Sequence, residues 1–342
     1  MARAREKSSP HEKVRELISG YWVSQCLFVV AKLGVADVLA KGPRTVASLA
    51  QQVGAQPAQL GRVLRALASQ GVFAEDAKGR FRLTALAQTL RSDRPGSLRN
   101  FTRMMVDDYN WQAWRALDRG VVGGELPFDH VHGVPIFEYL AEHPEEEAVF
   151  SASMASISGT ENEAVARAYP FGKLRQLVDV GGAHGHLLAT ILRRHKKLRG
   201  VLYDQPQVVA AAAKSGFLSA PELAGRSETR GGSFFEAVPA GADAYLMKYV
   251  LHDWTDEQCL QILGHCRDAM AEGGRVLAVD HVIPKGNGAH WGKLLDINML
   301  VLTGGRERTR EEFRELFASA GLRLARIVPT ACPLSILEAV RA

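Results

Sequence analysis

A histidine and two aspartates follow strand-like segments in the C-terminal half of the chain. The apolar run Ala244–Leu251 is followed by His252 and Asp253, and the next apolar run ends in Asp280. In a parallel sheet both runs would end at the same edge, where ligands bind in such folds. An imidazole beside a carboxylate can be held in one tautomer and made a better base. The pattern indicates a proton acceptor, but it also fits a cap for the helix expected from Thr255 onwards.

The glycine-rich segment 181–185 predicts a ligand-binding turn. It ends the strand Leu177–Gly182 and precedes the expected helix Leu187–His195. The next strand, Gly200–Tyr203, ends in Asp204, about twenty residues beyond the turn. Glycines let the backbone approach a ligand, the helix start offers free N–H groups, and a carboxylate can bind two ribose hydroxyls. A nucleotide-like ligand is therefore expected, and NAD in a dehydrogenase is one alternative.

From Arg175 onwards, strand and helix patterns alternate, which is typical of a mostly parallel α/β sheet. A helix over Arg310–Ala320 is followed by Arg323–Thr330 and Leu334–Val340, and the short turn between these two strands predicts a terminal antiparallel hairpin. The expected strands before that helix are Leu177–Gly182, Gly200–Asp204, Glu228–Phe234, Ala244–Leu251 and Arg275–Val282.

The N-terminal third is predicted to be a winged helix. An amphipathic helix over His11–Val30 precedes a helix pair, Thr45–Val53 and Pro57–Ser69, and two short strands, Gly71–Ala74 and Arg80–Thr84. Residues 101–170 read as helices rich in methionine and aromatic residues, which fit either a core or a pocket for a flat apolar ligand. We therefore predict domains over 1–100, 101–170 and 171–342.

Composition indicates a globular protein of the cytoplasm. The chain of 342 residues is 46% hydrophobic and 23% charged, and its longest early apolar stretch is too short to cross a bilayer. The four cysteines lack CxxC pairing and are expected to be reduced core thiols. Charge is uneven: residues 1–100 hold 16 Lys and Arg against 7 Asp and Glu, and the remainder holds 26 against 30.

Six ordered motifs carry a resemblance over almost the whole chain. They are Leu177–Gly185, Tyr203–Val208, Gly231–Phe235, Leu246–Glu257, Asp296–Leu300 and Gly305–Thr309. Together they resemble the small-molecule O-methyltransferases that use S-adenosylmethionine, the family of plant caffeic acid and hydroxyindole methyltransferases and of bacterial antibiotic-pathway enzymes. The resemblance implies a Rossmann-like class I methyltransferase sheet and a winged-helix domain that forms a homodimer.

The resemblance also assigns the cofactor site. The turn residues Gly181, Gly182 and Gly185 would lie against the methionine part of S-adenosylmethionine, and Asp204 would hold the ribose. The positions that meet adenine and the amino-acid end are Ser233, Phe234 and Lys248.

In this family His252 falls on the general base, flanked by the acidic positions Asp280 and Glu307. The expected reaction is methylation of an aromatic or heteroaromatic hydroxyl in secondary metabolism, releasing S-adenosylhomocysteine, with no metal ion, because no magnesium-binding set of acidic residues is recognisable. The residues assigned to the acceptor pocket are Met105, Phe150, Met154, Asn298 and Met299.

Three positions depart from the family pattern. Ala183 replaces a glycine and crowds the turn, and Ser233 replaces an aspartate that would accept a charge-assisted hydrogen bond from adenine. Asp280 is one methylene shorter than the usual glutamate, which leaves Glu307 as the expected main partner of His252.

Two further functions fit parts of the pattern. The departures fit neutral drift, which we favour, and they also fit a C-methyltransferase or a hydroxylase or decarboxylase that uses the bound cofactor, although the retained His252 favours transfer to a hydroxyl. The basic N-terminal third also fits a DNA-binding regulator, with Arg62 and Arg65 on the recognition helix. Against it, those arginines also fit a solvated helix face, and we expect neither a nucleic-acid nor a membrane partner.

Overall fold

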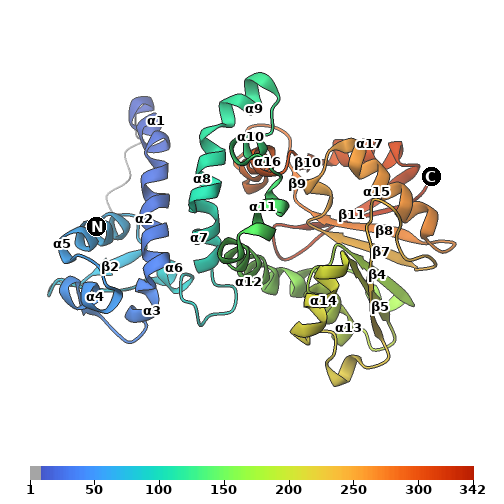
Figure 1. Cartoon of the computed structure of the whole chain (residues 1–342), viewed down its shortest axis with the longest axis horizontal. Coiled ribbons are helices and arrows are strands. Elements are labelled where there is room, and N and C mark those ends of the chain that lie inside the picture. The colour runs from blue at the N-terminus through green and yellow to red at the C-terminus, as the bar shows by residue number, and fades with distance from the viewer. Residues whose placement is uncertain (1–8) are drawn as a thin grey trace. The chain divides into compact units, whose positions relative to one another are not determined.

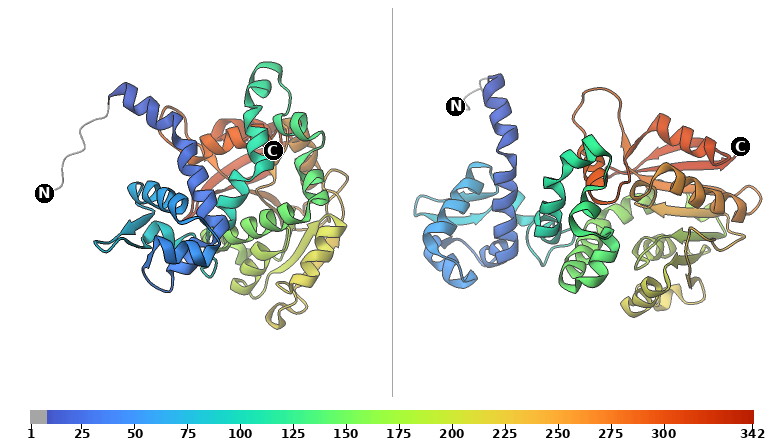
Figure 2. Two further views of the ribbon diagram at one scale, coloured as in Figure 1. Left: turned by 60° about the vertical axis from the view of Figure 1, so that its left-hand side comes forward. Right: turned by 45° about the horizontal axis from the view of Figure 1, so that its top comes forward.

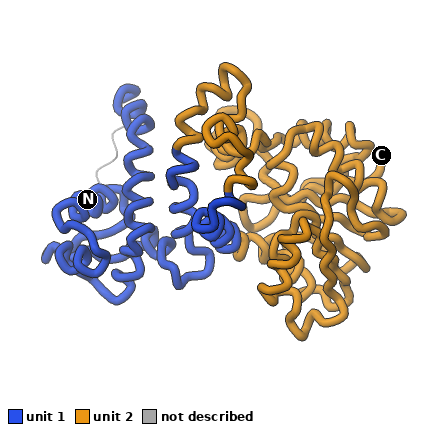
Figure 3. Tube along the Cα trace, in the orientation of Figure 1, with its two compact units in different colours: residues 1–111, 140–157 blue, residues 112–139, 158–342 orange. Residues whose placement is uncertain are grey.

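The structure is a computed structural model that describes residues 9–342, apart from the side chain of Thr160. The chain divides into two compact units, coloured separately in Figure 3. One unit runs to residue 111 and includes residues 140–157, and the other comprises residues 112–139 and 158–342. The predicted helical segment 101–170 is thus shared between two compact units, and the three predicted domains stay a division made on sequence pattern.

The first unit contains helices around a three-stranded antiparallel sheet in the order β1-β3-β2 (Figure 1). The predicted helix pair and two strands are present, and α4 starts directly after the capping residue Thr45. The prediction of a single helix over residues 11–30 is wrong, because the helix is interrupted at Ser19. The Ser19 hydroxyl donates to the Arg15 carbonyl at 2.9 Å. Ser19 and the following Gly20 both disfavour a helix interior, which explains the break. The elements are α1 (Pro10–Ile18), α2 (Gly20–Leu33), α3 (Val35–Leu39), β1 (Arg44–Thr45), α4 (Val46–Val53), α5 (Pro57–Ser69), β2 (Phe73–Glu75), β3 (Arg80–Leu83) and α6 (Ala85–Gln88).

Every regular element between residues 99 and 168 is a helix, as predicted. These helices are α7 (Arg99–Val106), α8 (Asp108–Arg115), α9 (Leu117–Gly123), α10 (Pro127–His132), α11 (Ile136–Glu142) and α12 (Pro144–Ala168).

The second unit is built on a seven-stranded sheet in the order β11-β12-β8-β7-β4-β5-β6. Five strands are parallel, and β12 and β11 are antiparallel to their neighbours, which confirms the predicted parallel sheet and terminal hairpin. The strands are β4 (Gln176–Val180), β5 (Arg199–Asp204), β6 (Ser227–Gly231), β7 (Ala244–Lys248), β8 (Arg275–Asp280), β11 (Leu322–Pro329) and β12 (Ser335–Arg341).

Helices cover both faces of this sheet, as the two further views in Figure 2 show. Alternate strand residues point to opposite faces, so Val178 and Tyr245 pack with α15 and α17, whereas Leu177 and Leu246 pack with α13. The helices of this region are α13 (His186–Arg194), α14 (Pro206–Ser215), α15 (Asp256–Ala269), α16 (Trp291–Leu302) and α17 (Arg310–Ser319).

The strand ends differ from the sequence prediction where the backbone leaves the sheet early. Strand β7 was expected to reach Leu251, but it stops at Lys248 because Tyr249 has φ +58°. Strand β4 stops at Val180 because Gly181 has φ +68°. A small parallel pair, β9 (Val282–Ile283) and β10 (Arg308–Thr309), then joins the chain after β8 to the chain before α17. These early exits put the motif residues in turns at one edge of the sheet.

No helix within residues 9–342 combines the length and apolar character needed to cross a bilayer. The cysteines are free thiols, as expected: Cys259 and Cys266 are buried in α15, and the half-buried Cys26 and Cys332 pack against core clusters.

Candidate active site

His252 lies in the short 3-10 turn Leu251–Asp253 that follows β7, and it is buried. Its Nδ1 is 2.8 Å from Oε1 of Glu307, and its Nε2 is 3.5 Å from Oδ1 of Asp253. The following helix is capped by Thr255, so the alternative in which His252 or Asp253 caps it is wrong. When Nδ1–H donates to Glu307, the neutral ring carries its lone pair on Nε2, which suits a proton acceptor.

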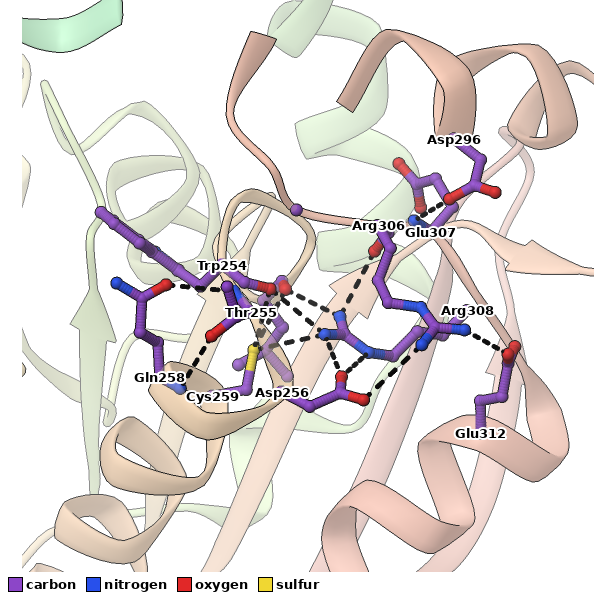
Figure 4. Close-up of polar contacts among 12 residues, drawn as sticks. Trp254, Thr255, Asp256, Gln258, Cys259, Asp296, Arg306, Glu307, Arg308 and Glu312 are labelled. Atoms are coloured by element: carbon purple, nitrogen blue, oxygen red, sulfur yellow. Dashed lines mark hydrogen bonds and ion pairs between the residues drawn. The ribbon is translucent and has the colours of Figure 1, made fainter. Parts of the chain in front are cut away.

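Glu307 reaches the imidazole from the loop between α16 and α17. Its side chain is fully buried, and its backbone N–H donates to Oδ1 of Asp296 at 2.8 Å (Figure 4). Two residues earlier, a Cβ added to Gly305 would overlap the carbonyl oxygen of His252. The loop that carries Glu307 and the turn that carries His252 are therefore in direct backbone contact.

Asp280 ends β8 and is completely buried. Neither of its carboxylate oxygens has a hydrogen-bond partner among the described residues. Of the two acidic positions expected beside His252, the structure brings Glu307 into hydrogen-bonding distance and leaves Asp280 without such a bond.

The carboxylates around His252 control its protonation. Burial alone would lower the pKa of the imidazole, but Asp253, the hydrogen bond that the ring donates to Glu307 and the more distant Asp280 outweigh it and raise the pKa to about 9. Burial raises the pKa of Asp280 to about 7, although the positive imidazole opposes this shift. Near neutral pH the raised pKa of His252 favours a charged imidazolium beside the carboxylate of Glu307.

Lys248 and Tyr249, which precede the turn, are tied to α12. Nζ of Lys248 lies 2.8 Å from Oε2 of Glu161 and within 3.2 Å of Asn162 Oδ1. The hydroxyl of Tyr249 donates to Oε1 of the same Glu161 at 2.9 Å. The Tyr249 ring also stacks on His252, with centroids 5.1 Å apart. Glu161 thus connects Lys248, the predicted cofactor lysine, to Tyr249, which stacks on His252.

The glycine-rich turn leaves no room for a side chain at Gly181, Gly182 or Gly185. At Gly185 a Cβ would come 2.7 Å from Leu218. A Cβ at Gly181 would come 2.9 Å from Val250, and one at Gly182 would come 2.5 Å from Oδ2 of the buried Asp179. Ala183 has φ +50°, a left-handed conformation that is strained for alanine. The Ala183 N–H donates to Oδ2 of Asp204 at 2.9 Å. The turn is therefore hydrogen-bonded to the carboxylate at the end of β5. Its glycines leave the main chain of the turn without side chains, so a ligand could approach it closely.

Ser233 and Phe234 follow β6 at the same edge. The Ser233 hydroxyl accepts a hydrogen bond from the Phe235 N–H at 3.3 Å, and Phe234 packs edge-on against Phe235 with centroids 4.9 Å apart. Ser233 therefore stabilises its own turn. An aspartate at this position would add a charge that this chain lacks.

The residues assigned to the acceptor pocket fall in different units. Met105, Phe150 and Met154 are half-buried in the first unit. Asn298 and Met299 are buried in the second, where Trp114 Nε1–H donates to Asn298 Oδ1 at 3.1 Å. Their common role in a pocket stays a prediction.

Sequence reasoning missed four residues of this region. Tyr249, Asp296 and Arg308 lie inside motifs that were recognised, so the segments were found but not the roles of these side chains. Glu161 lies outside every motif, and only the fold brings it to Lys248. Within residues 9–342, no set of three or more histidine, cysteine, aspartate or glutamate side chains is placed to hold a metal ion.

Comparisons with known proteins identify two regions of the chain. Residues 114–323 match the O-methyltransferase domain, and residues 15–93 match the O-methyltransferase dimerisation domain. Among characterised relatives, the phenazine O-methyltransferase PhzM of Lysobacter antibioticus is 43% identical over 324 residues, which cover 95% of this chain and 94% of that protein.

Solved structures give the same result. The crystal structure of LaPhzM superposes with a TM-score of 0.90 at 42% identity, covering 98% of this chain and all of that one. The O-methyltransferase NcsB1 from neocarzinostatin biosynthesis has a TM-score of 0.79 at 33% identity, covering 93% and 96% of the two chains. That crystal contains S-adenosyl-L-homocysteine and 1,4-dihydroxy-2-naphthoic acid.

Proposed function

Because the chain belongs to the O-methyltransferase family and is an S-adenosylmethionine-dependent O-methyltransferase, we propose that it methylates a hydroxyl of an aromatic or heteroaromatic small molecule with His252 as general base. The observation that carries this proposal is the buried pair of His252 Nδ1 and Glu307 Oε1, 2.8 Å apart. The relatives named above act on aromatic compounds, which supports an aromatic acceptor.

The residues of the sheet edge fit the cofactor. In our proposal the Gly181–Gly185 turn lies against its methionine part, Asp204 binds its ribose, and Ser233 and Phe234 border its adenine. Lys248 is the cation for the amino-acid end, and it is already buried beside Glu161. When bound, S-adenosylmethionine supplies a methyl group that its sulfonium has already activated, so the protein need not supply an electrophile.

The task left to the protein is to remove a proton and to align the acceptor. A phenolic hydroxyl has a pKa of about 10 and a free imidazole one of about 6.5. The carboxylates around His252 raise its pKa to about 9, closer to that of the phenol, and the positive sulfonium of the bound cofactor would lower it again. As the acceptor oxygen bonds to the methyl carbon, its proton passes to Nε2 of His252 and the carbon–sulfur bond breaks. The products are a methyl ether, S-adenosylhomocysteine and an imidazolium that Glu307 stabilises. No step in this scheme requires a metal.

The first unit supplies the basis for a homodimer. Helices α1 and α2 expose large apolar side chains, among them Leu17 (70% exposed), Ile18 (66%) and Trp22 (60%). The match to an O-methyltransferase dimerisation domain covers these residues. We propose that a second copy covers this face. Light scattering should give a dimer mass for the wild type and a monomer mass for a Leu17→Asp, Trp22→Ser variant.

The experiment that tests the function uses labelled S-adenosylmethionine and a panel of hydroxylated aromatics, with arylamines alongside. The product mass and the bond formed distinguish O-methylation from N- or C-methylation and from the hydroxylase and decarboxylase alternatives. A mobility shift on duplex DNA tests the regulator alternative, and we expect none. We also place the protein in the cytoplasm and in secondary metabolism; the similarity to NcsB1 from neocarzinostatin biosynthesis supports the second of these.

A further inference from the structure

Arg308 is the most deeply buried cation near the proposed base. Its side chain is 1% exposed, and it follows Glu307 directly in the chain. The proposed transfer reaction gives it no role, because Glu307 already binds the imidazole and Lys248 is the cation assigned to the cofactor.

The guanidinium of Arg308 binds the turn that holds His252. Its Nη1 donates to the Leu251 carbonyl at 2.8 Å, and its Nη2 donates to the Trp254 carbonyl at 3.3 Å (Figure 4). Leu251 and Trp254 lie on either side of the His252–Asp253 pair. The guanidinium of Arg308 therefore binds the backbone on both sides of the turn that carries His252.

The same side chain is fixed on the opposite side by Asp256 and by its own loop. Nη2 and Nε lie 2.7 Å and 3.1 Å from Oδ1 of Asp256, the first residue of α15. Nη1 also donates to the Arg306 carbonyl at 3.3 Å, so the residues before and after Glu307 are hydrogen-bonded to each other. A planar fork with five N–H groups can make these bonds together, and a lysine ammonium cannot.

We propose that Arg308 is a positioning residue, whose guanidinium joins the backbone around His252 to the backbone around Glu307 and so sets the spacing of this pair. The inference rests on the proposed role of His252 as general base. The same two segments also lie close together where Gly305 meets the His252 carbonyl.

Stability alone does not require an arginine here. Burying a cation carries a desolvation cost, and buried ion pairs can often be replaced by apolar residues without loss of stability. The carboxylate partner Asp256 is itself 49% exposed, which weakens its attraction for the guanidinium. Arg308 contributes hydrogen bonds of fixed direction to three backbone carbonyls and one carboxylate.

The test compares Arg308→Lys and Arg308→Met with wild type, using S-adenosylmethionine and an acceptor found in the panel above. Misplacement of a catalytic group by about 1 Å costs about 100-fold in rate, so we expect kcat to fall by 10- to 100-fold in both variants. The KM for the cofactor should stay within about threefold, because Arg308 touches no residue of the proposed cofactor site.

A second readout separates position from charge. NMR titration of His252 gives its pKa without any turnover. Asp253, Glu307 and Asp280 raise that value, the Tyr249 ring stacks on the imidazole, and His281 lies near enough to interact with its charge. Loss of a nearby cation alone would raise the pKa in Arg308→Met and leave it unchanged in Arg308→Lys. Loss of the Glu307 hydrogen bond through misplacement lowers the pKa in both variants, and this is the expected result.

Arg306→Met is the matched control, because Arg306 also pairs with Asp256 but is 45% exposed and binds neither Leu251 nor Trp254 through its side chain. It should keep kcat within about twofold. If an Arg308 variant does not fold by circular dichroism, Asp256→Asn carries the same test, with kcat falling and the cofactor KM unchanged.

The positioning role would be overturned if Arg308→Lys kept the wild-type kcat and its His252 pKa were unchanged or raised. The same outcome in Asp256→Asn would overturn it if that variant has to replace Arg308→Lys. Full activity of His252→Gln would instead refute the general base. The titration would then still report whether Arg308 holds the histidine and glutamate together.

Discussion

The ring of Tyr249 lies stacked on the imidazole of His252, with the two planes inclined by 24° and the centroids 5.1 Å apart. Tyr249 adopts φ +58°, in a region that non-glycine residues rarely occupy. Its hydroxyl is anchored to Glu161. A strained, anchored tyrosine therefore covers one face of the proposed base and restricts how the ring can turn.

Replacing Tyr249 tests this restriction. Tyr249→Phe keeps the stacked ring and loses one hydrogen bond, so kcat should stay within about threefold and stability should fall by about 1 kcal/mol. Tyr249→Leu removes the aromatic cover, and kcat should fall about tenfold because the imidazole gains freedom. Steady-state kinetics at saturating cofactor measure both. Equal kcat values for the two variants would show that the stacked ring has no catalytic consequence.

The general base itself is tested by His252→Gln. The amide keeps the bulk of the ring and cannot accept the proton, so kcat should fall by about 100- to 10,000-fold. Cofactor affinity, measured by calorimetry, should stay within about threefold, because His252 is not one of the residues assigned to the cofactor. A variant that methylates at the wild-type rate would contradict the assignment.

The pH dependence follows from the pKa of His252, which Asp253, Glu307 and Asp280 raise to about 9. Only the neutral ring accepts a proton, so kcat/KM for the acceptor should rise with pH. The bound sulfonium is positive and lowers this pKa, so the midpoint should fall between about 6.5 and 9. The stability of the fold should change in the opposite direction to the rate. The stabilisation that His252 contributes is complete below its unfolded pKa and is lost as pH rises through about 9. A pH–rate profile that falls over this range would exclude the neutral imidazole as the acceptor.

The two buried acids near His252 should differ in effect. Glu307→Gln removes the charge that the imidazole binds at 2.8 Å, so kcat should fall about 10- to 100-fold. Asp280→Asn should matter little below pH 7, because burial raises the pKa of Asp280 to about 7 and the acid is largely neutral there. Above that pH the carboxylate ionises and stabilises the imidazolium, so the deficit of the asparagine variant should grow. Rates at pH 6 and pH 9 measure the difference, and an Asp280→Asn deficit larger at the lower pH would contradict it.

Strain in the glycine-rich turn can be relieved by Ala183→Gly. Alanine at φ +50° is strained, so glycine should raise the free energy of unfolding by about 0.5–1 kcal/mol. Ala211→Gly is the matched control: Ala211 is exposed within α14, and glycine there should destabilise by about 1 kcal/mol. Thermal denaturation measures both, and a loss of stability in Ala183→Gly would show that the turn is not strained.

Hydrophobic pattern and turn residues predicted most elements of the second unit, because most of its strands are bounded by a glycine or by a helix start. They failed at the end of β7, where the apolar run continues to Leu251 but the backbone turns at Tyr249. A local pattern reports burial, and Val250 and Leu251 are buried without being in the sheet. Likewise, the break at Ser19 interrupts a helix whose apolar periodicity continues on both sides.

The partners of the site were less predictable. Motifs located His252, Glu307 and Asp280, and side-chain length correctly favoured Glu307 as the hydrogen-bond partner. Glu161 is 87 residues from Lys248 in the sequence and carries no motif, so only the folded chain brings the two together. Arg308 was read as part of a motif, but its bonds go to backbone carbonyls, which sequence patterns do not encode.

The tight approach at Gly305 has a consequence for redesign of acceptor selectivity. Any side chain at position 305 would collide with the carbonyl of His252, so a mutant library that diversifies this loop would consist mostly of inactive members. Met105, Phe150 and Met154, which we assign to the acceptor pocket, are half-buried side chains outside this loop. These are the positions that we would vary first in a search for new acceptors.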